Sequence, residues 1–349
     1  MSGGTALVTG GCGFVGRHVV SRLLAEGWYV WVIDNTSTGK PPEGWVPAVR
    51  TIRRTDGAAT YVCPGGASLT FIPGDVRQVL RAAIDARTLP PFNLVCHLAA
   101  VVGGRMKIDG DPLAVATDLS IDAEFFNWAI RANPDRVLYA SSSAAYPVDL
   151  QESEGHVALR EDMIDFERGR LGMPDMTYGW AKLTGEYLAR IAAQKYGLHV
   201  ACVRPFSGYG EDQDESYPVP AIAARAARRE DPLTVWGSGQ QGRDFVHIDD
   251  CVEAMLRAVE VISDGSAVNI GSGKLTTFLE VAAMFARLEG YEPEIKPLVD
   301  KPVGVQARYA DPSRARQLLG WAPSISLEEG FGRVLEAARR RHASPLEVV

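Results

Sequence analysis

The chain has 349 residues, of which 46% are hydrophobic and 23% charged, and its formal net charge is −7. These fractions are ordinary for a globular protein, and the length is enough for two lobes. The negative charge argues against nucleic acid as a partner, because phosphate backbones bind basic surfaces. Apolar runs stay well short of the roughly 18 residues of a membrane span, so no membrane association is expected.

The first strand candidate begins within a few residues of the N-terminus, so we expect no signal peptide. Five widely spaced cysteines and the absence of a CxxC or His/Cys cluster predict reduced thiols, no metal site and a cytoplasmic location.

Through the first 210 residues, short apolar runs alternate with amphipathic segments. The predicted strands are Thr5–Thr9, Tyr29–Asp34, Leu69–Pro73, Leu94–Leu98, Arg136–Ser141 and His199–Arg204, and the predicted helices lie near 16–26, 76–86, 112–131 and 178–196. Strands separated by helices form parallel βαβ units, so the pattern predicts an α/β protein with a Rossmann-type doubly wound parallel sheet.

Two regions depart from this alternation. Residues 40–67 form a Pro- and Gly-containing insertion, interpreted as a lid or an interface loop. From residue 211 onward an acidic loop (211–215), a helix (220–230) and smaller elements follow, and the charged tail from Arg339 is expected to fray. We therefore predict a dinucleotide-binding domain over 1–210 and a smaller α/β substrate lobe over 211–349, with some chain returning to the first domain.

A glycine loop, TGGCGFVG at 9–16, directly follows the first predicted strand. Gly10 permits a tight turn, Gly13 lets the backbone approach a pyrophosphate, and Gly16 lets the next helix pack closely. The N-terminus of that helix offers backbone N–H groups to phosphates. Asp34 ends the second strand, where its carboxylate would accept a ribose 2′-hydroxyl and repel a 2′-phosphate. The pattern predicts NAD rather than NADP.

In an open sheet of this kind, ligands bind at the carboxyl ends of the strands. The segments expected at that edge are Asp75–Val76, Leu98–Ala99–Ala100, Ser141–Ser142–Ser143 and Pro205–Phe206–Ser207.

Tyr178 and Lys182 are four residues apart and therefore share one face of a helix. The ammonium group would stabilise the phenolate and lower the tyrosine pKa from about 10. Ser142 at a strand end could hydrogen-bond the same substrate oxygen. A phenolate and a hydroxyl beside a nicotinamide can remove the proton of an alcohol while hydride leaves its carbon.

At this point residues 4–335 resemble the extended short-chain dehydrogenase/reductase family, in particular its nucleotide-sugar epimerases and dehydratases. The resemblance rests on TGGCGFVG (9–16), DNTSTG (34–39), GDV (74–76), HLAA (97–100), SSSAAYP (141–147), YGWAK (178–182), RPFSGYG (204–210), GRDFVHIDD (242–250), NIGSG (269–273) and DPSRARQLLGWAP (311–323). It implies bound NAD, a nucleotide-diphosphate sugar held between two lobes, and a homodimer formed by the helices at 112–131 and 178–196.

The resemblance also implies functional residues. Ser142, Tyr178 and Lys182 match the catalytic triad. The expected NAD contacts are Gly10, Gly13, Phe14, Val15, Gly16, Asp34, Asn35, Ser37, Thr38, Gly39, Asp75, Val76, Leu98, Ala99, Ala100, Tyr178, Lys182 and Pro205. The expected substrate contacts are Gly103, Gly104, Ser142, Ser143, Ser207, Val219, Trp236, Arg243 and Arg308, of which the arginines match residues that grip the diphosphate with a planar fork of donors.

The residues after Ser142 separate the reactions within the family. Dehydratases carry an Asp-Glu pair there, whereas this chain has Ser143–Ala144. GDP-sugar 3,5-epimerases carry a cysteine at the position of Ala144 and a basic residue after the segment matching 204–210. In this chain the stretch after Tyr209 is acidic and has no lysine or histidine before Pro220. A 4-epimerase needs neither group, so we predict 4-epimerisation through a transient 4-keto sugar.

Alternatives remain open. Four segments resemble GDP-sugar enzymes: VVGG (101–104), Tyr146–Pro147, VWGSG (235–239) and the run 303–323. A 3,5-epimerase-like, dehydratase or decarboxylase activity is therefore an alternative. An alternative of another class is a non-catalytic NAD-binding sensor or scaffold, against which the retained triad argues.

Two departures from the family pattern concern the substrate side. Asp118 stands where many members have an asparagine near the cofactor, and Ser207 replaces an asparagine that commonly touches the substrate. Neither the nucleotide base nor the sugar is predicted, although Arg105 or Lys107 could serve a carboxylated sugar.

Overall fold

A computed structural model describes residues 3–103, 109–152 and 154–343. Its centre is a sheet in the order β13-β8-β7-β6-β1-β2-β5-β4-β3, nine strands within these ranges. The strands are β1 (Thr5–Thr9), β2 (Tyr29–Asp34), β3 (Arg50–Arg53), β4 (Ala59–Val62), β5 (Ser68–Pro73), β6 (Leu94–His97), β7 (Val137–Ala140), β8 (Val200–Pro205) and β13 (Asp264–Ile270). The six predicted strands are confirmed, with ends within one residue.

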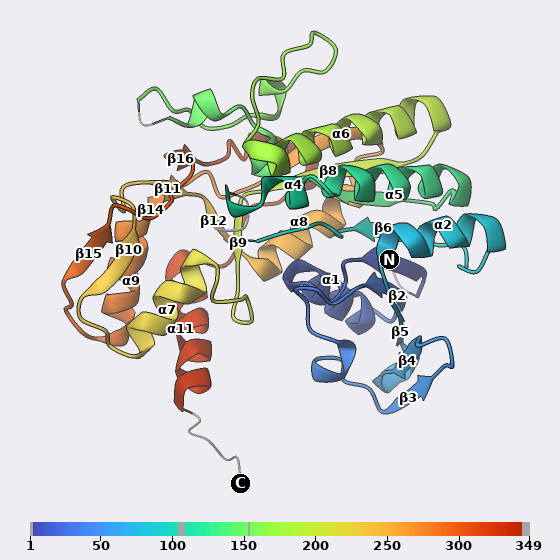
Figure 1. Cartoon of the computed structure of the whole chain (residues 1–349), viewed down its shortest axis with the longest axis horizontal. Helices are drawn as coiled ribbons and strands as arrows, with labels where there is room; N and C mark the ends of the chain where they lie inside the picture. The colour runs from blue at the N-terminus through green and yellow to red at the C-terminus, as the bar shows by residue number, and fades with distance from the viewer. Residues whose placement is uncertain (1–2, 104–108, 153, 344–349) are drawn as a thin grey trace.

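The sheet from β5 through β13 is parallel, and among the described strands of this sheet the antiparallel pairs are β3–β4 and β4–β5. The predicted Rossmann-type fold is therefore confirmed. The 40–67 insertion is a hairpin, formed by β3 and β4, that extends the sheet beyond β5 (Figure 1). It adds an antiparallel edge because a short turn can join only antiparallel strands.

Helices cover both faces of the sheet (Figure 1). One face carries α1 (Phe14–Ala25), α8 (Ile248–Val261) and α10 (Ser313–Leu319), and the other carries α2 (Val76–Ala86), α5 (Asp118–Ala132) and α6 (Met176–Tyr196). Strands buried on both faces are mainly apolar, as in β6 and β8, where His97 and Arg204 near the carboxyl ends are the ionisable exceptions. The fold is a three-layer α/β sandwich.

The predicted helix at 112–131 is two helices, α4 (Pro112–Val115) and α5. Asp111 caps α4 by accepting the Ala114 N–H at 3.2 Å. In α5, Ile121, Phe125 and Ala129 are buried at four-residue spacing, which turns one face of the helix toward the sheet.

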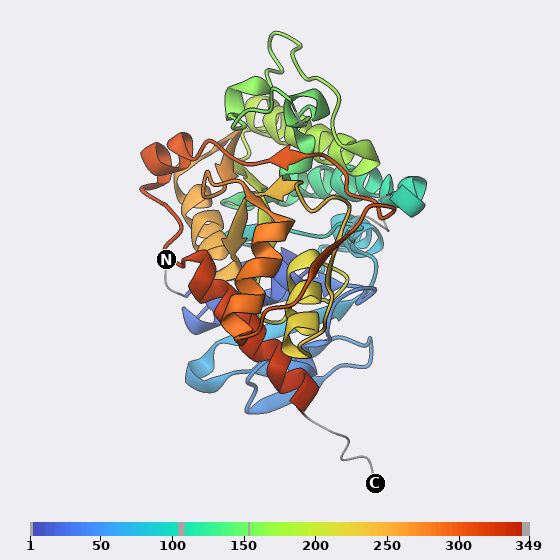
Figure 2. The ribbon, with the colours of Figure 1, turned by 90° about the vertical axis from the view of Figure 1, so that its left-hand side faces the viewer.

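The C-terminal part forms a smaller α/β unit beside this sandwich, seen facing the viewer in Figure 2. Its helices are α7 (Pro218–Ala227), α9 (Phe278–Glu289) and α11 (Leu327–Ala343), and its strands are β9 (Ser207–Tyr209), β10 (Leu233–Trp236), β11 (Gly242–Arg243), β12 (Phe245–His247), β14 (Thr276–Thr277), β15 (Ile295–Leu298) and β16 (Ala307–Arg308). Short 3-10 turns occur at Pro42–Gly44, Pro64–Gly66, Ser143–Ala145, Val148–Gln151 and Glu161–Met163.

An apolar cluster that includes Val219, Phe245, Phe285 and Phe331 forms the core of this unit. The helix expected at 220–230 is α7, which starts two residues earlier. The tail does not fray at Arg339, because α11 continues to Ala343 and packs on α7 and α9. Chain beyond 211 does return to the large sheet as β13, while the division at 210/211 stays a prediction.

All five cysteines are buried free thiols. Across the described ranges, no cluster of three or more His, Cys, Asp or Glu side chains is arranged to bind a metal ion. Nor does any helix in those ranges have the length and apolar character needed to cross a membrane.

Candidate active site

The glycine loop between β1 and α1 leaves no room for a side chain at Gly10 or Gly16. Gly10 has φ +71°, and a Cβ there would lie 2.7 Å from the Ala99 nitrogen. A Cβ on Gly16 would lie 2.2 Å from the Gly10 carbonyl oxygen. Gly13 is the N-cap of α1 and no side chain caps this helix, so its first N–H groups point to the loop. This arrangement fits a pyrophosphate, as the sequence predicts.

Asp34 links the end of β2 to this loop. Its Oδ2 accepts the Cys12 N–H at 2.9 Å and its Oδ1 accepts the Thr36 N–H at 2.7 Å. Gly39 lies against Cys12, so the predicted segment Asn35–Gly39 folds back beside the glycine loop. The carboxylate is thereby fixed where a ribose of a dinucleotide would reach it.

The remaining predicted cofactor residues follow neighbouring strands. Gly74 donates its N–H to the Asp34 carbonyl oxygen at 3.0 Å, which places the start of α2 beside β2. Asp75 caps α2 and is ion-paired with Arg77, whose hydrogen bonds lower the Asp75 pKa. Predicted contacts Val76, Leu98, Ala99, Ala100 and Pro205 lie at the carboxyl ends of β5, β6 and β8, as expected.

Ser142, Tyr178 and Lys182 converge beside this edge. Tyr178 lies in the first turn of α6, and Ser142 is its side-chain hydrogen-bond partner. The Lys182 Nζ lies 5.7 Å from the centre of the Tyr178 ring and is almost fully buried. The structure thus assembles the predicted hydroxyl, phenol and ammonium from β7 and α6.

Ser142 is also the appropriate choice among the three serines. Ser141 is buried and donates to Glu186, which forms a buried ion pair with Arg204 at 2.6 Å. Ser143 is buried in the 3-10 turn that Ser142 caps. Only Ser142 of the three is both partly exposed and bonded to Tyr178.

The expected direction of the Tyr178 pKa shift is wrong for the protein alone. Burial raises the pKa of Tyr178 above 10, and although Lys182 and the Ser142 hydrogen bond lower it, the net shift is upward. Carboxylates at Asp118 and Asp122 add to the rise. Sequence spacing shows the lysine but not the desolvation that opposes it.

A buried polar network lies behind Lys182. His97 contacts Asp122 through Nε2 at 3.1 Å and Thr9 through Nδ1 at 2.7 Å, and the Tyr139 hydroxyl donates to Asp122 at 2.6 Å. Burial lowers the His97 pKa, so this imidazole is neutral near pH 7. The Lys182 Nζ lies 5.5 Å from the centre of the Tyr139 ring, which places the network against the triad.

Arg243 and Arg308 are brought together from segments 65 residues apart. They are direct register partners of the parallel strands β11 and β16. The Arg308 Nη2 is paired with Asp175 at 2.9 Å, and its Nε donates to Gln151 at 2.5 Å. Arg243 donates to the carbonyl oxygens of Gly242 and Val303. Two arginines at paired positions of neighbouring strands suit a diphosphate.

The other predicted substrate residues are more dispersed. Ser207 begins β9, and Trp236 ends β10 with 37% of its side chain exposed. Val219 is buried in the C-terminal core. Gly103 follows β6, while Gly104, Arg105 and Lys107 lie outside the described residues.

Sequence reasoning missed Gln151, Asp175 and Asp122. Asp175 precedes Tyr178 by three residues at the N-cap of α6, and Asp122 follows Asp118 by one helical turn. The four-residue spacing of two acids on an otherwise apolar face was a usable signal for Asp122. No sequence signal pointed to Asp175 and Gln151 as partners of Arg308, because they lie 133 and 157 residues away along the chain.

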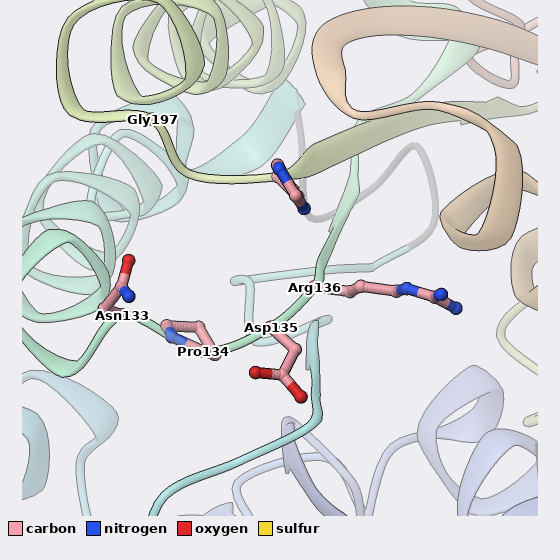
Figure 3. Close-up of a pocket in the computed structure, with 6 residues that line it drawn as sticks. Asn133, Pro134, Asp135, Arg136 and Gly197 are labelled. Atoms are coloured by element: carbon pink, nitrogen blue, oxygen red, sulfur yellow. The ribbon is translucent and has the colours of Figure 1, made fainter.

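Figure 3 shows a surface pocket at the opposite end of the sheet. It is formed where β7 and β8 begin and where α5 and α6 end, and is lined by Asn133, Pro134, Asp135, Arg136, Gly197 and His199. Since the glycine loop and Tyr178 lie at the carboxyl ends of the strands, this pocket is not part of the candidate active site.

The chain is similar in sequence and structure to known nucleotide-sugar enzymes. UDP-glucose 4-epimerase of Mycolicibacterium smegmatis is 26% identical over 96% of this chain and 98% of its own length. dTDP-4-dehydro-6-deoxy-D-allose reductase of a Streptomyces species is 28% identical over 92% of each chain. The crystal structure of Thermotoga maritima UDP-glucose 4-epimerase with UDP-glucose has a TM-score of 0.79 and 26% identity over 97% of this chain and 99% of that one.

The model of the NAD-dependent epimerase/dehydratase family matches residues 6–271, which span the glycine loop, the triad and the start of the C-terminal unit. The predicted family, the predicted enzyme class and the predicted use of NAD are confirmed. The chain belongs to the NAD-dependent epimerase/dehydratase family, within the extended short-chain dehydrogenases/reductases.

Proposed function

We propose that the protein inverts carbon 4 of a nucleotide-diphosphate sugar through a transient 4-keto sugar. The observation that carries this proposal is the convergence of Ser142, Tyr178 and Lys182 beside the dinucleotide loop. Similarity to UDP-glucose 4-epimerases over nearly the whole chain supports the reaction and favours a UDP-sugar.

NAD held by the glycine loop and Asp34 would supply reversible hydride chemistry at carbon 4 of the sugar. Tyr178 removes the 4-hydroxyl proton, and Ser142 hydrogen-bonds the same oxygen. Lys182 stabilises the phenolate by charge. Burial raises the Tyr178 pKa, and the positive charge of a nicotinamide ring beside the phenol would oppose that rise, as Lys182 does.

Arg243 and Arg308 hold the diphosphate in this proposal. Their adjacency on β11 and β16 presents two cations to one ligand, and Asp175 orients the Arg308 fork. Holding the nucleotide while leaving the sugar less constrained lets the 4-keto sugar turn within the pocket. Predicted contacts Gly103, Ser143, Ser207, Val219 and Trp236 belong to the same proposal.

The composition beside Ser142 supports 4-epimerisation over the alternatives. Ser143 and Ala144 carry no carboxylate for loss of water and no thiol for exchange at carbons 3 and 5. Both side chains are buried, so neither is positioned as an additional acid or base.

Isotope tracing tests the proposal. Protein is incubated with UDP-glucose, UDP-N-acetylglucosamine, UDP-glucuronate and GDP-mannose, each carrying deuterium at carbon 4, and products are identified by NMR. The expected product is the 4-epimer with its label retained at carbon 4 and no net change in nicotinamide absorbance. Solvent hydrogen at carbon 3 or 5, or stoichiometric consumption of reduced nicotinamide, would contradict it.

The proposal extends to a homodimer, a cytoplasmic location and a domain boundary near residue 210. Exposed apolar side chains on α5 and α6, among them Leu119, Trp180 and Tyr187, support a dimer through these helices. Five buried free thiols suit a reducing compartment. Sedimentation equilibrium tests the dimer, and Tyr187→Asp is expected to weaken it.

A further inference from the structure

Two carboxylates, Asp118 and Asp122, lie one turn apart on the buried face of α5, and both interact electrostatically with Lys182. Neither side chain is more than 1% exposed. A buried charge is tolerated only when it is paired or hydrogen-bonded, so the hydrogen-bond partners of each carboxylate decide whether it is stable as an anion.

Asp122 is fully satisfied. Its Oδ1 is 3.1 Å from the His97 Nε2 and its Oδ2 accepts the Tyr139 hydroxyl at 2.6 Å. With His97 neutral, its Nε2–H donates to Asp122, and its Nδ1 accepts the Thr9 hydroxyl. Asp122 therefore has a hydrogen-bond partner on each oxygen and the Lys182 charge nearby.

Asp118 is only half satisfied. Its Oδ1 accepts the Val101 N–H at 2.5 Å, whereas its Oδ2 is buried and has no hydrogen-bond partner among the residues that the structure describes. Burial raises the pKa of Asp118 to about 6, with Lys182 opposing the rise and Asp122 adding to it. With a pKa of about 6, Asp118 can gain or lose a proton near neutral pH.

The groups facing this pair come from every neighbouring element. They are His97 of β6, Tyr139 of β7, and Tyr178 and Lys182 of α6, with Tyr217 before α7 interacting with Tyr178. Of these, Lys182 alone is a cation near pH 7. Within the described residues, two carboxylates therefore meet one ammonium, and an oxidised nicotinamide ring bound beside Lys182 would supply a second positive charge.

We propose that Asp118 is the counter-ion of the oxidised nicotinamide and takes up a proton when the bound cofactor is reduced. With oxidised NAD, Lys182 and the nicotinamide balance two carboxylates. With reduced NAD, the ring is neutral and the buried cluster returns to balance when one proton from water joins the Asp118 carboxylate. The inference rests on the proposed position of the nicotinamide beside Tyr178 and Lys182.

Difference infrared spectroscopy of the holoenzyme tests this directly. An amine–borane delivers hydride to the bound NAD at pH 5.5–7.5, with reduction followed by nicotinamide absorbance and no sugar present. The expected result is a new C=O stretch of one protonated carboxyl per subunit. Its apparent pKa should be at least about one unit higher in the reduced than in the oxidised holoenzyme, the shift that a nearby opposite charge produces.

Asp118→Asn conserves shape and should abolish this band, while Asp85→Asn on the exposed side of α2 should leave it unchanged. Asp118→Asn should also shift the relative affinity for oxidised over reduced NAD by about tenfold toward the reduced form. Absence of the band in the unmodified protein would overturn the proposal without any variant. Persistence of the band in Asp118→Asn would do so as well. Because no sugar takes part, either result is independent of the 4-epimerase assignment.

Discussion

Alanine substitutions at Gly13 and Gly16 should have different effects: Gly16→Ala should lower the stability of the protein, and Gly13→Ala should lower its affinity for NAD. At Gly16 the new Cβ would lie 2.2 Å from the Gly10 oxygen and 2.7 Å from the Gly11 Cα. Both are backbone atoms, so the clash cannot be relieved by rotation of a side chain. The loop backbone would have to move by about 0.8 Å to lengthen the first contact to 3.0 Å. Overpacking of this kind costs about 1–3 kcal/mol.

At Gly13 the same substitution meets only the Gly10 oxygen, at 3.3 Å, and the backbone φ of −68° suits any residue. We therefore expect Gly13→Ala to change the free energy of unfolding by less than about 1 kcal/mol. Its methyl group would stand where the pyrophosphate approaches α1, so NAD affinity should fall at least tenfold.

Urea unfolding of the cofactor-free proteins and NAD titration by calorimetry separate the two effects. Gly332→Ala is the matched control: it lies within α11, and its added Cβ meets nothing within 4 Å, so it should stabilise by about 1 kcal/mol. A Gly16→Ala protein as stable as the unmodified one, or a Gly13→Ala protein with unchanged NAD affinity, would refute the steric reasoning.

Three further predictions concern the catalytic and diphosphate groups. Tyr178→Phe should lower turnover at least about 10²-fold in the NMR assay and leave the NAD content of the purified protein unchanged, whereas unchanged turnover would remove Tyr178 as the base. Arg308→Ala should raise KM and also destabilise the protein in urea unfolding, because it removes the buried ion pair with Asp175. Arg243→Ala should raise KM as well, and an unchanged KM in both variants would contradict the diphosphate role. The pKa of Asp118, about 6 against about 3.9 when unfolded, means that its ionisation opposes folding as pH rises through this window. Asp118→Asn should therefore stabilise the cofactor-free protein by about 3 kcal/mol at pH 8 and hardly at all at pH 4, which thermal melts at both pH values can check.

The local part of the active site was predictable from spacing alone. The positions of Gly10, Gly13 and Gly16 follow from the loop after the first strand and the start of the next helix. The position of Asp34 follows from the end of the second strand. Tyr178 and Lys182 share a helix face because four residues make about one turn. The alternation of strands and helices likewise determined the parallel sheet, since each βαβ unit is specified by its own residues.

Two sequence-based predictions were wrong where contacts with neighbouring helices or strands decided the local structure. The 40–67 insertion was expected as a loop, yet β4 pairs with β5 and gives the hairpin a place on the sheet. The end of α11 was expected to fray because it is charged, yet packing against α7 and α9 holds the helix through Ala343. Both are cases in which tertiary contact outweighs local composition.

The sequence by itself thus determined the dinucleotide loop, the triad and the family, because their geometry is contained in short segments. Only the tertiary structure decided that Arg243 and Arg308 are neighbours, that Asp175 pairs with Arg308, and that Asp118 is buried with a free oxygen beside Lys182. It also decided the direction of the Tyr178 pKa shift. Strand register and desolvation depend on atoms distant in the chain, and spacing along one segment does not encode them.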